Sequence, residues 1–413
     1  MERADHCTRE NIKKPKKWIK FRHRLVTSIL KAILKPYLSL KCGVKVKPFL
    51  EQGDKQYLIL MNHQTGFDQF LVGLAFKGPV YYVASEHIFS NGLLSRLLSY
   101  LVAPIPIKKQ TVDAAAVRTC IKVKREGGTI AIAPEGNRTY SGRTGYFKDS
   151  IIHLARFFKI PIALFRIEGG YGVMPRWSDV IRKGSMTAYV SRVITPEEYA
   201  KLSDNEFYTL IKKELYVDEA VAGDLFYHKK AAEYLERAMY VCPFCGLSVF
   251  ESNKDMIECT KCGRKIRYMP TKELAGVDFD FPYRFVADWY DYQCEYVSSL
   301  DLGLFGDKPI YSDEIAFSRV ILYKKKERIC DHARLSLYND RVTILADGKV
   351  YDMPFLDIDV MTVLAKNKLN IYFKDKLYQI SGKKRFNALK YMNIYFRKSN
   401  MRKGADDVKF LGL

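Results

Sequence analysis

The sequence predicts an α/β domain, then a small cysteine-containing segment, then a mostly β domain closed by a helix. Three observations carry this prediction. Strand-like and helical runs alternate over residues 51–222, two Cys-x-x-Cys pairs lie within residues 223–275, and short strand-like runs fill most of residues 276–413. Alternating strands and helices are typical of a mainly parallel sheet covered by helices. At 413 residues, the chain is long enough for two or three domains.

The first domain contains six apolar runs that predict strands, at residues 57–61, 80–84, 104–107, 129–133, 161–167 and 187–193. Helical stretches lie between them, and the clearest, over residues 111–126, carries small and apolar residues at helical spacing. In α/β sheets, functional side chains gather where the strands end. The loops that follow the strands are therefore the place to look for chemistry.

Residues 1–50 predict a basic, amphipathic segment that contacts a membrane. They hold 14 Lys and Arg residues against 3 acidic ones, about half of the net charge of +22. From Trp18, apolar residues recur every three to four positions, and Pro36 is expected to bend or end this helix. The apolar stripe either lies in a membrane interface or packs on the protein. The cationic excess favours an anionic membrane surface.

Three further features of the sequence predict where in the cell the protein resides. The first dozen residues are polar, so no secretory signal peptide is expected. No run of 18 or more apolar residues occurs, so a spanning helix is not expected. Nine cysteines with two Cys-x-x-Cys pairs favour metal binding in a reducing cytosol over disulfides. Together these predict a peripheral or monotopic protein on the cytoplasmic face of a membrane.

A histidine and an aspartate follow the first predicted strand, in the stretch Asn62-His63-Gln64-Thr65-Gly66-Phe67-Asp68. A carboxylate that accepts from one ring nitrogen holds the tautomer in which the other nitrogen is a base. Such a unit takes a proton from a hydroxyl or a thiol. Taken alone, a pair at this spacing is more often structural than catalytic.

A second polar stretch, Pro134-Glu135-Gly136-Asn137-Arg138-Thr139, follows the predicted strand at residues 129–133. Gly136 permits a tight turn, and the guanidinium of Arg138 offers a fork of donors that suits a phosphate.

These two stretches, in this order, resemble the glycerolipid acyltransferase family, the 1-acylglycerol-3-phosphate acyltransferases and their relatives. That family has a histidine, four residues and an aspartate, followed later by a Phe-Pro-Glu-Gly-Thr-Arg block. The segments 103–109 and 160–163 fit two weaker blocks, and the resemblance covers roughly residues 20–220. The departures are Ala133 for phenylalanine, Asn137 for threonine, Ala103 for glycine and Lys109 for arginine. Lys109 keeps the charge without the bidentate geometry.

The resemblance implies an acyltransferase that moves a fatty acyl group from acyl-CoA or acyl-carrier protein to a lysophospholipid hydroxyl, as in lysophosphatidic acid. His63 would be the general base and Asp68 its orienting partner. The acceptor-binding residues would be Lys109, Glu135, Gly136, Asn137 and Arg138. Backbone donors around Gly66 are candidates for stabilising the oxyanion. No Gly-x-Ser-x-Gly elbow occurs, which favours direct transfer without an acyl-enzyme.

Four cysteines predict a structural zinc site. Cys242 and Cys245 form one pair, Cys259 and Cys262 form the other after thirteen residues, and a glycine follows each pair. Four thiolates suit tetrahedral Zn²⁺ and leave no open position for catalysis. The segment resembles a zinc ribbon, and disulfides or a redox pair are the alternative. A helical connector is predicted over residues 204–239.

The last part of the chain predicts a helix at residues 280–300, then seven short strands and a closing helix. The strand-like runs are 315–324, 333–338, 341–346, 349–353, 357–363, 368–373 and 376–380, separated by turn pairs such as Asp347-Gly348. This order of elements resembles the pleckstrin-homology or GRAM superfold. Such domains often bind lipid headgroups or proteins, and the fold alone does not say which.

Two other classes of protein remain open at this point. A lipid-binding scaffold derived from an acyltransferase would fit the departures at Ala103 and Lys109. A nucleic-acid-binding protein would fit the zinc ribbon and the positive charge, but the sequence contains no clear basic and aromatic recognition module, so no nucleic-acid partner is expected.

Overall fold

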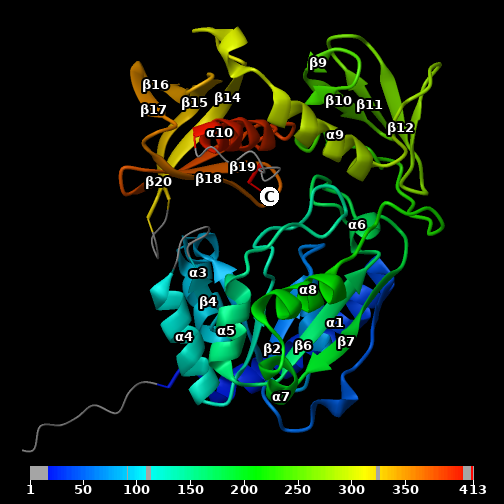
Figure 1. The fold of residues 1–413 in the computed structure, drawn as a ribbon, viewed down its shortest axis with the longest axis vertical. Coiled ribbons are helices and arrows are strands. Elements are labelled where there is room, and N and C mark those ends of the chain that lie inside the picture. Colours follow the sequence, from blue (N-terminus) through cyan, green and yellow to red (C-terminus); the bar gives the residue numbers. More distant parts are fainter. Residues whose placement is uncertain (1–16, 91, 108–112, 322–325, 403–410, 413) are drawn as a thin grey trace, which may run out of the picture.

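A computed structural model of the chain describes residues 17–90, 92–107, 113–321, 326–402 and 411–412. Figure 1 shows the α/β domain in the lower half of the view and two β-rich modules above it. The α/β domain and a separate, mostly β C-terminal domain confirm the predicted order of fold classes.

The α/β domain is built on one seven-stranded sheet. Its order is β1 (Val44–Val46), β7 (Met186–Ile194), β6 (Ile162–Glu168), β2 (Leu58–Met61), β5 (Thr129–Ile132), β3 (Val80–Ser85) and β4 (Ile105–Ile107). All neighbouring strands are parallel except β6 and β7. The six predicted strands are confirmed, and β1 was missed because three residues give too short a pattern to recognise.

The central strand β2 is buried on both faces. Leu58 and Leu60 pack in one apolar cluster with residues of α4 (Ala114–Arg125), α5 (Ser150–Phe158) and α8 (Asp204–Leu215). Ile59 and Met61 pack in another cluster with residues of α1 (Phe21–Cys42) and α2 (Asp68–Ala75). A strand covered on both faces reads as a continuous apolar run, which is why its sequence is Leu-Ile-Leu-Met. Helix α3 (Leu93–Leu101) and the short helices α6 (Gly170–Val173) and α7 (Pro196–Ala200) also belong to this domain.

Of the two effects predicted for Pro36, a bend or an end of the first helix, helix α1 corrects the second. The helix runs on through Pro36 to Cys42 and is closed by Gly43 in the left-handed conformation. A proline removes one helical hydrogen bond, but Leu38 and Cys42, which follow it, are fully buried and hold the last turns in place. The apolar residues on the opposite side of this helix remain exposed, as described below.

The connector also differs from its prediction. Helix α8 ends at Leu215, and of residues 216–239 only the short 3₁₀ turn Leu235–Arg237 is helical. Tertiary pairing outweighs local periodicity here, because Tyr227 exchanges backbone hydrogen bonds with Lys183. Phe226 is fully buried and lies close to Gly172 and Gly184.

The cysteine-containing module has a two-stranded sheet, β8 (Val241–Cys242) with β9 (Gly246–Leu247), and a four-stranded antiparallel sheet. The latter is formed by β10 (Phe250–Asn253), β11 (Met256–Cys259), β12 (Lys265–Tyr268) and β13 (Leu274–Gly276). Helix α9 (Val286–Ser299) then confirms the helix predicted over residues 280–300.

The C-terminal sheet has seven antiparallel strands in the order β17-β16-β15-β14-β20-β19-β18, so the first strand of the series pairs with the last. The strands are β14 (Tyr311–Val320), β15 (Glu327–Leu337), β16 (Arg341–Ala346), β17 (Lys349–Pro354), β18 (Ile358–Leu364), β19 (Lys368–Phe373) and β20 (Lys376–Gly382). Helix α10 (Leu389–Arg402) packs against β18 and β19. All seven predicted strands and the closing helix are confirmed; the likeness to a pleckstrin-homology or GRAM domain stays a prediction.

Candidate active site

Two neighbouring parallel strands deliver the two polar stretches to the same edge of the sheet. Strands β2 and β5 pair in register, with Leu60 opposite Ile132. His63 follows the end of β2 and Glu135 follows the end of β5, so their loops leave the sheet side by side. The loops are joined directly, because the backbone N–H of Thr139 donates to the carbonyl of His63 at 3.2 Å.

Asp68 is fully buried and holds the histidine. Its Oδ2 lies 2.7 Å from Nδ1 of His63, and its two oxygens also accept from the backbone N–H groups of Gln64 and Thr65 and from the hydroxyl of Thr65. A carboxylate with this many donors is fixed in position. It also stands in the first turn of α2, where a negative charge is stabilised by the helix dipole.

The hydrogen bond to Asp68 sets the tautomer of His63. Because Nδ1–H donates to the carboxylate, the lone pair of the neutral ring is on Nε2. The His63 side chain is 24 % exposed while that of Asp68 is 0 % exposed, so the ring, and not the carboxylate, is open to substrate.

Asn62 fixes the backbone immediately before the histidine. Its side-chain amide donates to the carbonyl of Ile167 and accepts from the N–H of the same residue, both at 2.8 Å. These two bonds extend the pairing of β2 with β6 by one side chain, and so hold the point at which the chain turns toward His63.

Glu135 joins the two loops through its carboxylate. Oε1 accepts from the N–H of His63 at 2.8 Å, and Oε2 accepts from the N–H of Gly145 at 2.6 Å. Burial raises the pKa of the Glu135 carboxyl to about 8, against the two backbone donors, which favour the ionised form. These contacts make Glu135 a positioning residue for the loops.

The turn after β5 presents Arg138 to the histidine loop. Gly136 has a φ of +68° and its N–H closes a turn on the carbonyl of Ala133, a conformation that glycine adopts without strain. Half-buried Asn137 follows it in the same loop. A Cβ placed on Gly66 would lie 3.7 Å from Nη1 of Arg138, so the guanidinium lies against the backbone of the His63 loop.

No carboxylate among the described residues forms an ion pair with Arg138. Burial, together with the nearby charge of Arg176, lowers the pKa of Arg138 to about 10. A partly buried guanidinium beside another cation is the kind of group that an anionic ligand stabilises.

Several backbone donors predicted to serve an oxyanion have other partners. The N–H groups of Gln64 and Thr65 donate to Asp68, and that of Phe67 donates to the hydroxyl of Thr65. These three groups support the His–Asp pair.

The structure brings together His63, Asp68, Glu135, Gly136, Asn137 and Arg138, whereas Lys109 lies outside the described residues. The sequence did contain a signal for Thr65, since Thr-x-x-Asp at a helix start is close to a capping box. Arg176, whose side chain donates to the carbonyl of Arg138, has no local signal.

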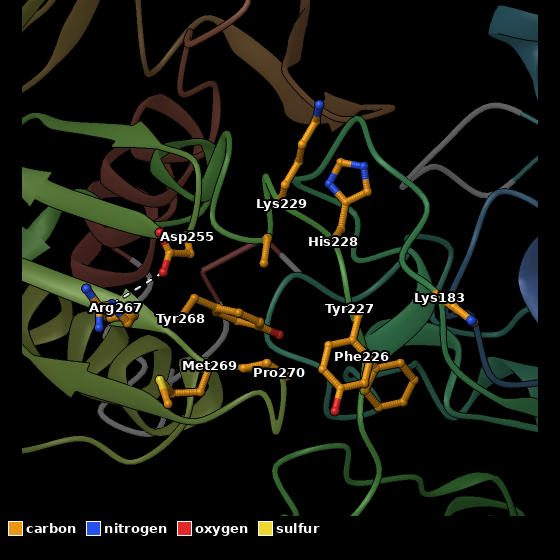
Figure 2. A pocket seen from close by; sticks show the side chains of 11 residues that line it. Lys183, Phe226, Tyr227, His228, Lys229, Asp255, Arg267, Tyr268, Met269 and Pro270 are labelled. Atoms are coloured by element: carbon orange, nitrogen blue, oxygen red, sulfur yellow. Dashed lines mark ion pairs between the residues drawn. The ribbon is translucent and has the colours of Figure 1, made fainter.

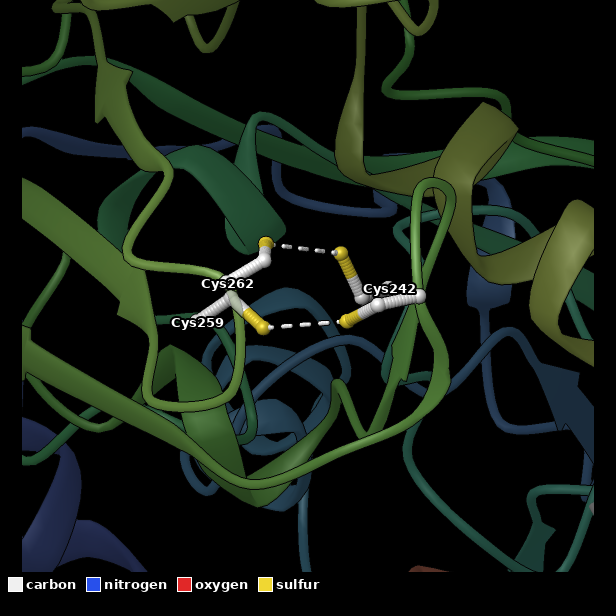
Figure 3. A group of neighbouring side chains, drawn as sticks. Cys242, Cys259 and Cys262 are labelled. Atoms are coloured by element: carbon white, nitrogen blue, oxygen red, sulfur yellow. Dashed lines mark hydrogen bonds between the residues drawn. The ribbon is translucent and has the colours of Figure 1, made fainter.

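The four predicted metal ligands also converge, in the separate cysteine-containing module (Figure 3). Their sulfur atoms all lie within 4.8 Å of one another, and the Cys242–Cys262 and Cys245–Cys259 sulfur pairs are 3.8 and 3.6 Å apart. Zinc bound tetrahedrally at about 2.3 Å would place its sulfur ligands about 3.8 Å apart. The geometry therefore fits a four-thiolate zinc site.

A cavity of about 510 Å³ lies where the connector meets the cysteine-containing module (Figure 2). Lys183, Phe226, Tyr227, His228, Met269 and Pro270 are among the residues that line it. None of the candidate active-site residues lines this cavity.

Part of the chain, including both loops, is similar in sequence to known acyltransferases. Residues 44–167 match the family model described as "Acyltransferase". A 1-acyl-sn-glycerol-3-phosphate acyltransferase of Bacillus subtilis (strain 168) is 25 % identical over 176 residues, which cover 42 % of this chain and 84 % of that protein. The enzyme of the same name from Saccharomyces cerevisiae (strain ATCC 204508 / S288c) is 23 % identical over 186 residues, with coverage of 43 % and 61 %.

A third relative, the chloroplastic 1-acyl-sn-glycerol-3-phosphate acyltransferase BAT2 of Brassica napus, is 21 % identical, and the match spans 51 % of its length. Among solved structures, the 1-acyl-sn-glycerophosphate (LPA) acyltransferase PlsC from Thermotoga maritima matches with 17 % identity and a TM-score of 0.39, covering 47 % of this chain and 78 % of that one. The sequence matches confirm the resemblance to acyltransferases for the part of the chain that holds both loops. The cysteine-containing module and the C-terminal sheet lie outside the family match.

Proposed function

We propose that the protein transfers an acyl group from a thioester to the hydroxyl of a phosphorylated lysophospholipid such as lysophosphatidic acid. The observation that carries the proposal is the placement of the His63–Asp68 pair beside the Arg138 guanidinium at one edge of the sheet. The first group suits removal of a hydroxyl proton, and the second suits a phosphate on the same acceptor molecule. The similarity of residues 44–167 to acyltransferases supports it.

In the proposed reaction, Nε2 of His63 takes the proton of the acceptor hydroxyl while the hydroxyl oxygen attacks the thioester carbonyl. Asp68 stabilises the imidazolium that forms. The C–S bond then breaks, the new ester forms, and the thiol of CoA or of a carrier protein leaves with a proton returned by His63. Proton, acyl group and thiol balance without a covalent enzyme intermediate.

We propose the remaining roles from the charges around the site. Arg138 pairs with the acceptor phosphate, and Lys109 is proposed as a second cation for it. Glu135, Gly136 and Asn137 shape the turn that carries Arg138, with Glu135 bound to the backbone of His63. The loop after β5 thus both carries the proposed phosphate-binding Arg138 and, through Glu135, contacts the backbone of the proposed base His63.

The membrane partner is proposed from an exposed apolar surface on two helices in contact, α1 and α3 (Leu93–Leu101). Arg22 of α1 lies 3.8 Å above the ring of Tyr100 in α3 and donates to its carbonyl. Large apolar side chains that are about half or more exposed cover both helices: Phe21, Leu25, Ile29, Ile33, Tyr37, Leu40, Leu93, Leu94, Leu97 and Tyr100. We call this the α1–α3 surface.

Exposed basic residues Arg24, Lys35 and Lys41 flank the apolar residues of α1. Apolar side chains with cations beside them suit the interface of an anionic bilayer, where the acceptor and product reside. None of the helices in the described ranges is long and apolar enough to cross a bilayer. We therefore propose peripheral binding, on the cytosolic face, where a thiolate metal site remains reduced.

We further propose that the four cysteines hold one structural Zn²⁺. Ser248 lies 3.0 Å from the sulfur of Cys259 and would support that ligand. The metal would stabilise the module, and it supplies no step of the acyl transfer.

His63→Ala should lower kcat for thioester consumption with lysophosphatidic acid at least about a hundredfold, because the general base is removed. His153→Ala is the matched control, since that histidine is 67 % exposed and belongs to another helix. Near-wild-type turnover of a folded His63→Ala protein would remove the assignment. A wild type that binds lysophospholipid vesicles but consumes no thioester would indicate a lipid-binding scaffold.

Arg138→Ala should raise the KM for lysophosphatidic acid about tenfold or more and leave the KM for the acyl thioester nearly unchanged, because a charge-assisted bond to phosphate is lost. Arg138→Lys should recover part of the loss, since it keeps the charge without the fork. Steady-state kinetics with each substrate varied in turn gives both values. An equal rise for donor and acceptor would make Arg138 structural.

Replacing Phe21, Leu25, Ile29 and Ile33 with serine should lower the partition of the protein onto anionic vesicles at least about a hundredfold, because each buried apolar side chain contributes about 1.5–3 kcal/mol. Vesicle sedimentation measures this. Leu304→Ser with Leu356→Ser is the control, as these leucines are 80 % and 66 % exposed outside the α1–α3 surface. Equal sedimentation of the fourfold variant and the wild type would exclude this surface.

Purified protein should contain about one zinc per chain by elemental analysis, and Cys242→Ser with Cys262→Ser should lose most of it. The same double change should lower the melting temperature, because the metal links the two cysteine pairs. Metal-free wild-type protein with oxidised cysteine pairs, prepared under reducing conditions, would contradict the zinc proposal.

A further inference from the structure

The loop that carries the proposed acceptor-binding residues is held from outside the α/β domain. We call residues 134–147, between β5 and α5, the motif loop. It contains Glu135 and Arg138 near its start, and its later residues contact the C-terminal sheet and helix α9. The side chains that make the contacts, those of Arg176, Tyr140 and Arg143, lie outside both sequence motifs.

The first contact is to the turn between β18 and β19. Arg176, which is 1 % exposed, donates from Nη1 to the carbonyl of Arg138 at 2.7 Å. Its other donors reach the carbonyls of Ala365 at 2.7 Å and Val363 at 3.1 Å. One guanidinium therefore bridges the backbone of the proposed phosphate-binding residue and the C-terminal sheet.

Tyr140 strengthens the same contact. Its hydroxyl donates to the carbonyl of Lys366 at 2.6 Å, and the Arg176 guanidinium lies 4.2 Å above its ring. Both side chains are almost fully buried. A buried guanidinium and a buried hydroxyl are costly without partners, so the motif loop and the β18–β19 turn stabilise each other's position.

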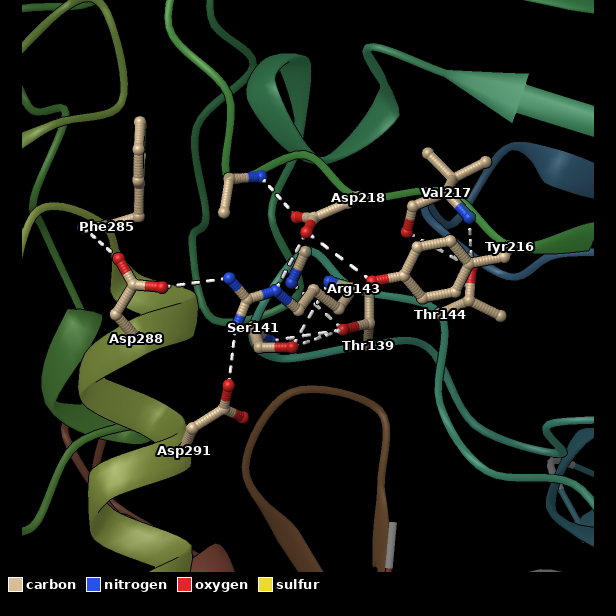
Figure 4. A network of polar contacts seen from close by, with 12 residues as sticks. Thr139, Ser141, Arg143, Thr144, Tyr216, Val217, Asp218, Phe285, Asp288 and Asp291 are labelled. Atoms are coloured by element: carbon tan, nitrogen blue, oxygen red, sulfur yellow. Dashed lines mark hydrogen bonds and ion pairs between the residues drawn. The ribbon is translucent and has the colours of Figure 1, made fainter. Parts of the chain in front are cut away.

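The second contact is to helix α9 (Figure 4). Arg143 of the motif loop pairs with Asp218 of the connector at 3.0 Å, and with Asp288 of α9 at 2.8 Å. Asp291, one turn further along α9, also accepts from this guanidinium. Arg143 thus ties the far part of the motif loop to the helix that follows the cysteine-containing module.

We propose that the C-terminal half of the chain sets the acceptor affinity by holding the motif loop through Arg176, Tyr140 and Arg143. This inference rests on the proposed function, since it assigns acceptor binding to Arg138. The three are positioning residues: they act on the backbone that carries Arg138 and do not touch the His63 ring. Because the three residues act on the loop that carries Arg138, we expect their replacement to change the KM of the acceptor and not that of the donor thioester.

The test uses the full chain with Tyr140→Phe, which deletes one hydroxyl, and Asp291→Ala, which deletes one carboxylate from α9. Hydrogen–deuterium exchange of residues 134–147 is measured without substrate, and the KM of lysophosphatidic acid and of acyl-CoA is measured for each variant. Asp331→Ala is the control, because it removes a surface pair with Arg328 at 3.3 Å within β15. Arg176→Lys adds a variant that keeps the buried charge.

Faster exchange in the motif loop, with an acceptor KM raised about three- to tenfold and an unchanged donor KM, supports the proposal. The control should show neither change. Unchanged exchange in Tyr140→Phe, Asp291→Ala and Arg176→Lys overturns it, and so does faster exchange with an unchanged acceptor KM. If the wild-type protein shows no acyl transfer, the proposed function is wrong. The exchange measurement then still decides whether Arg176, Tyr140 and Arg143 hold the motif loop.

Discussion

The carboxylate of Glu135 links the loop that follows β5 to the loop that follows β2, and the candidate site depends on this link. It binds the N–H of His63 on one side and the N–H of Gly145 on the other. Together with the backbone hydrogen bond from Thr139 to His63, this side chain holds the proposed base in place relative to the loop that carries Arg138. Misplacement by about 1 Å can cost an enzyme about a hundredfold in rate, so a rigid link of this kind is what the proposed chemistry requires.

Burying charged groups in and around the candidate site has an electrostatic cost in free energy. Burial and the nearby cation Arg176 lower the pKa of Arg138, nearby buried Asp68 raises it, and burial raises the pKa of the Glu135 carboxyl. A further buried pair, Lys272 with Glu219 at 3.1 Å, joins the cysteine-containing module to the connector. Removing one partner of such a pair typically costs about 3–5 kcal/mol. The interface between the α/β domain with its connector and the C-terminal part of the chain therefore contains buried charged groups that are stabilised by their partners.

The sequence was informative where the determinants are local. The strands were found because buried parallel strands are continuous apolar runs, and His63 and Asp68 were found because five positions link a strand end to a helix start. Contacts between residues far apart in the chain could not be predicted from the sequence. Arg176 meets carbonyls 187 and 189 residues away, and nothing near it in the sequence indicates this.

The two errors have the same origin. Pro36 was expected to bend or end the first helix; the helix does not end there, because burial of Leu38 and Cys42 outweighs the lost hydrogen bond. The connector after Leu215 was expected to be helical, yet pairing of Tyr227 with Lys183 draws it out of a helix. In both places, contacts with distant segments override a local preference.

The central claim is that base and phosphate-binding group act on one acceptor molecule, and a crystal structure of the protein with bound lysophosphatidic acid tests it most directly. The account predicts the phosphate in contact with the Arg138 guanidinium and the acceptor hydroxyl about 3 Å from Nε2 of His63. A phosphate bound away from Arg138, with the hydroxyl out of reach of His63, would contradict it.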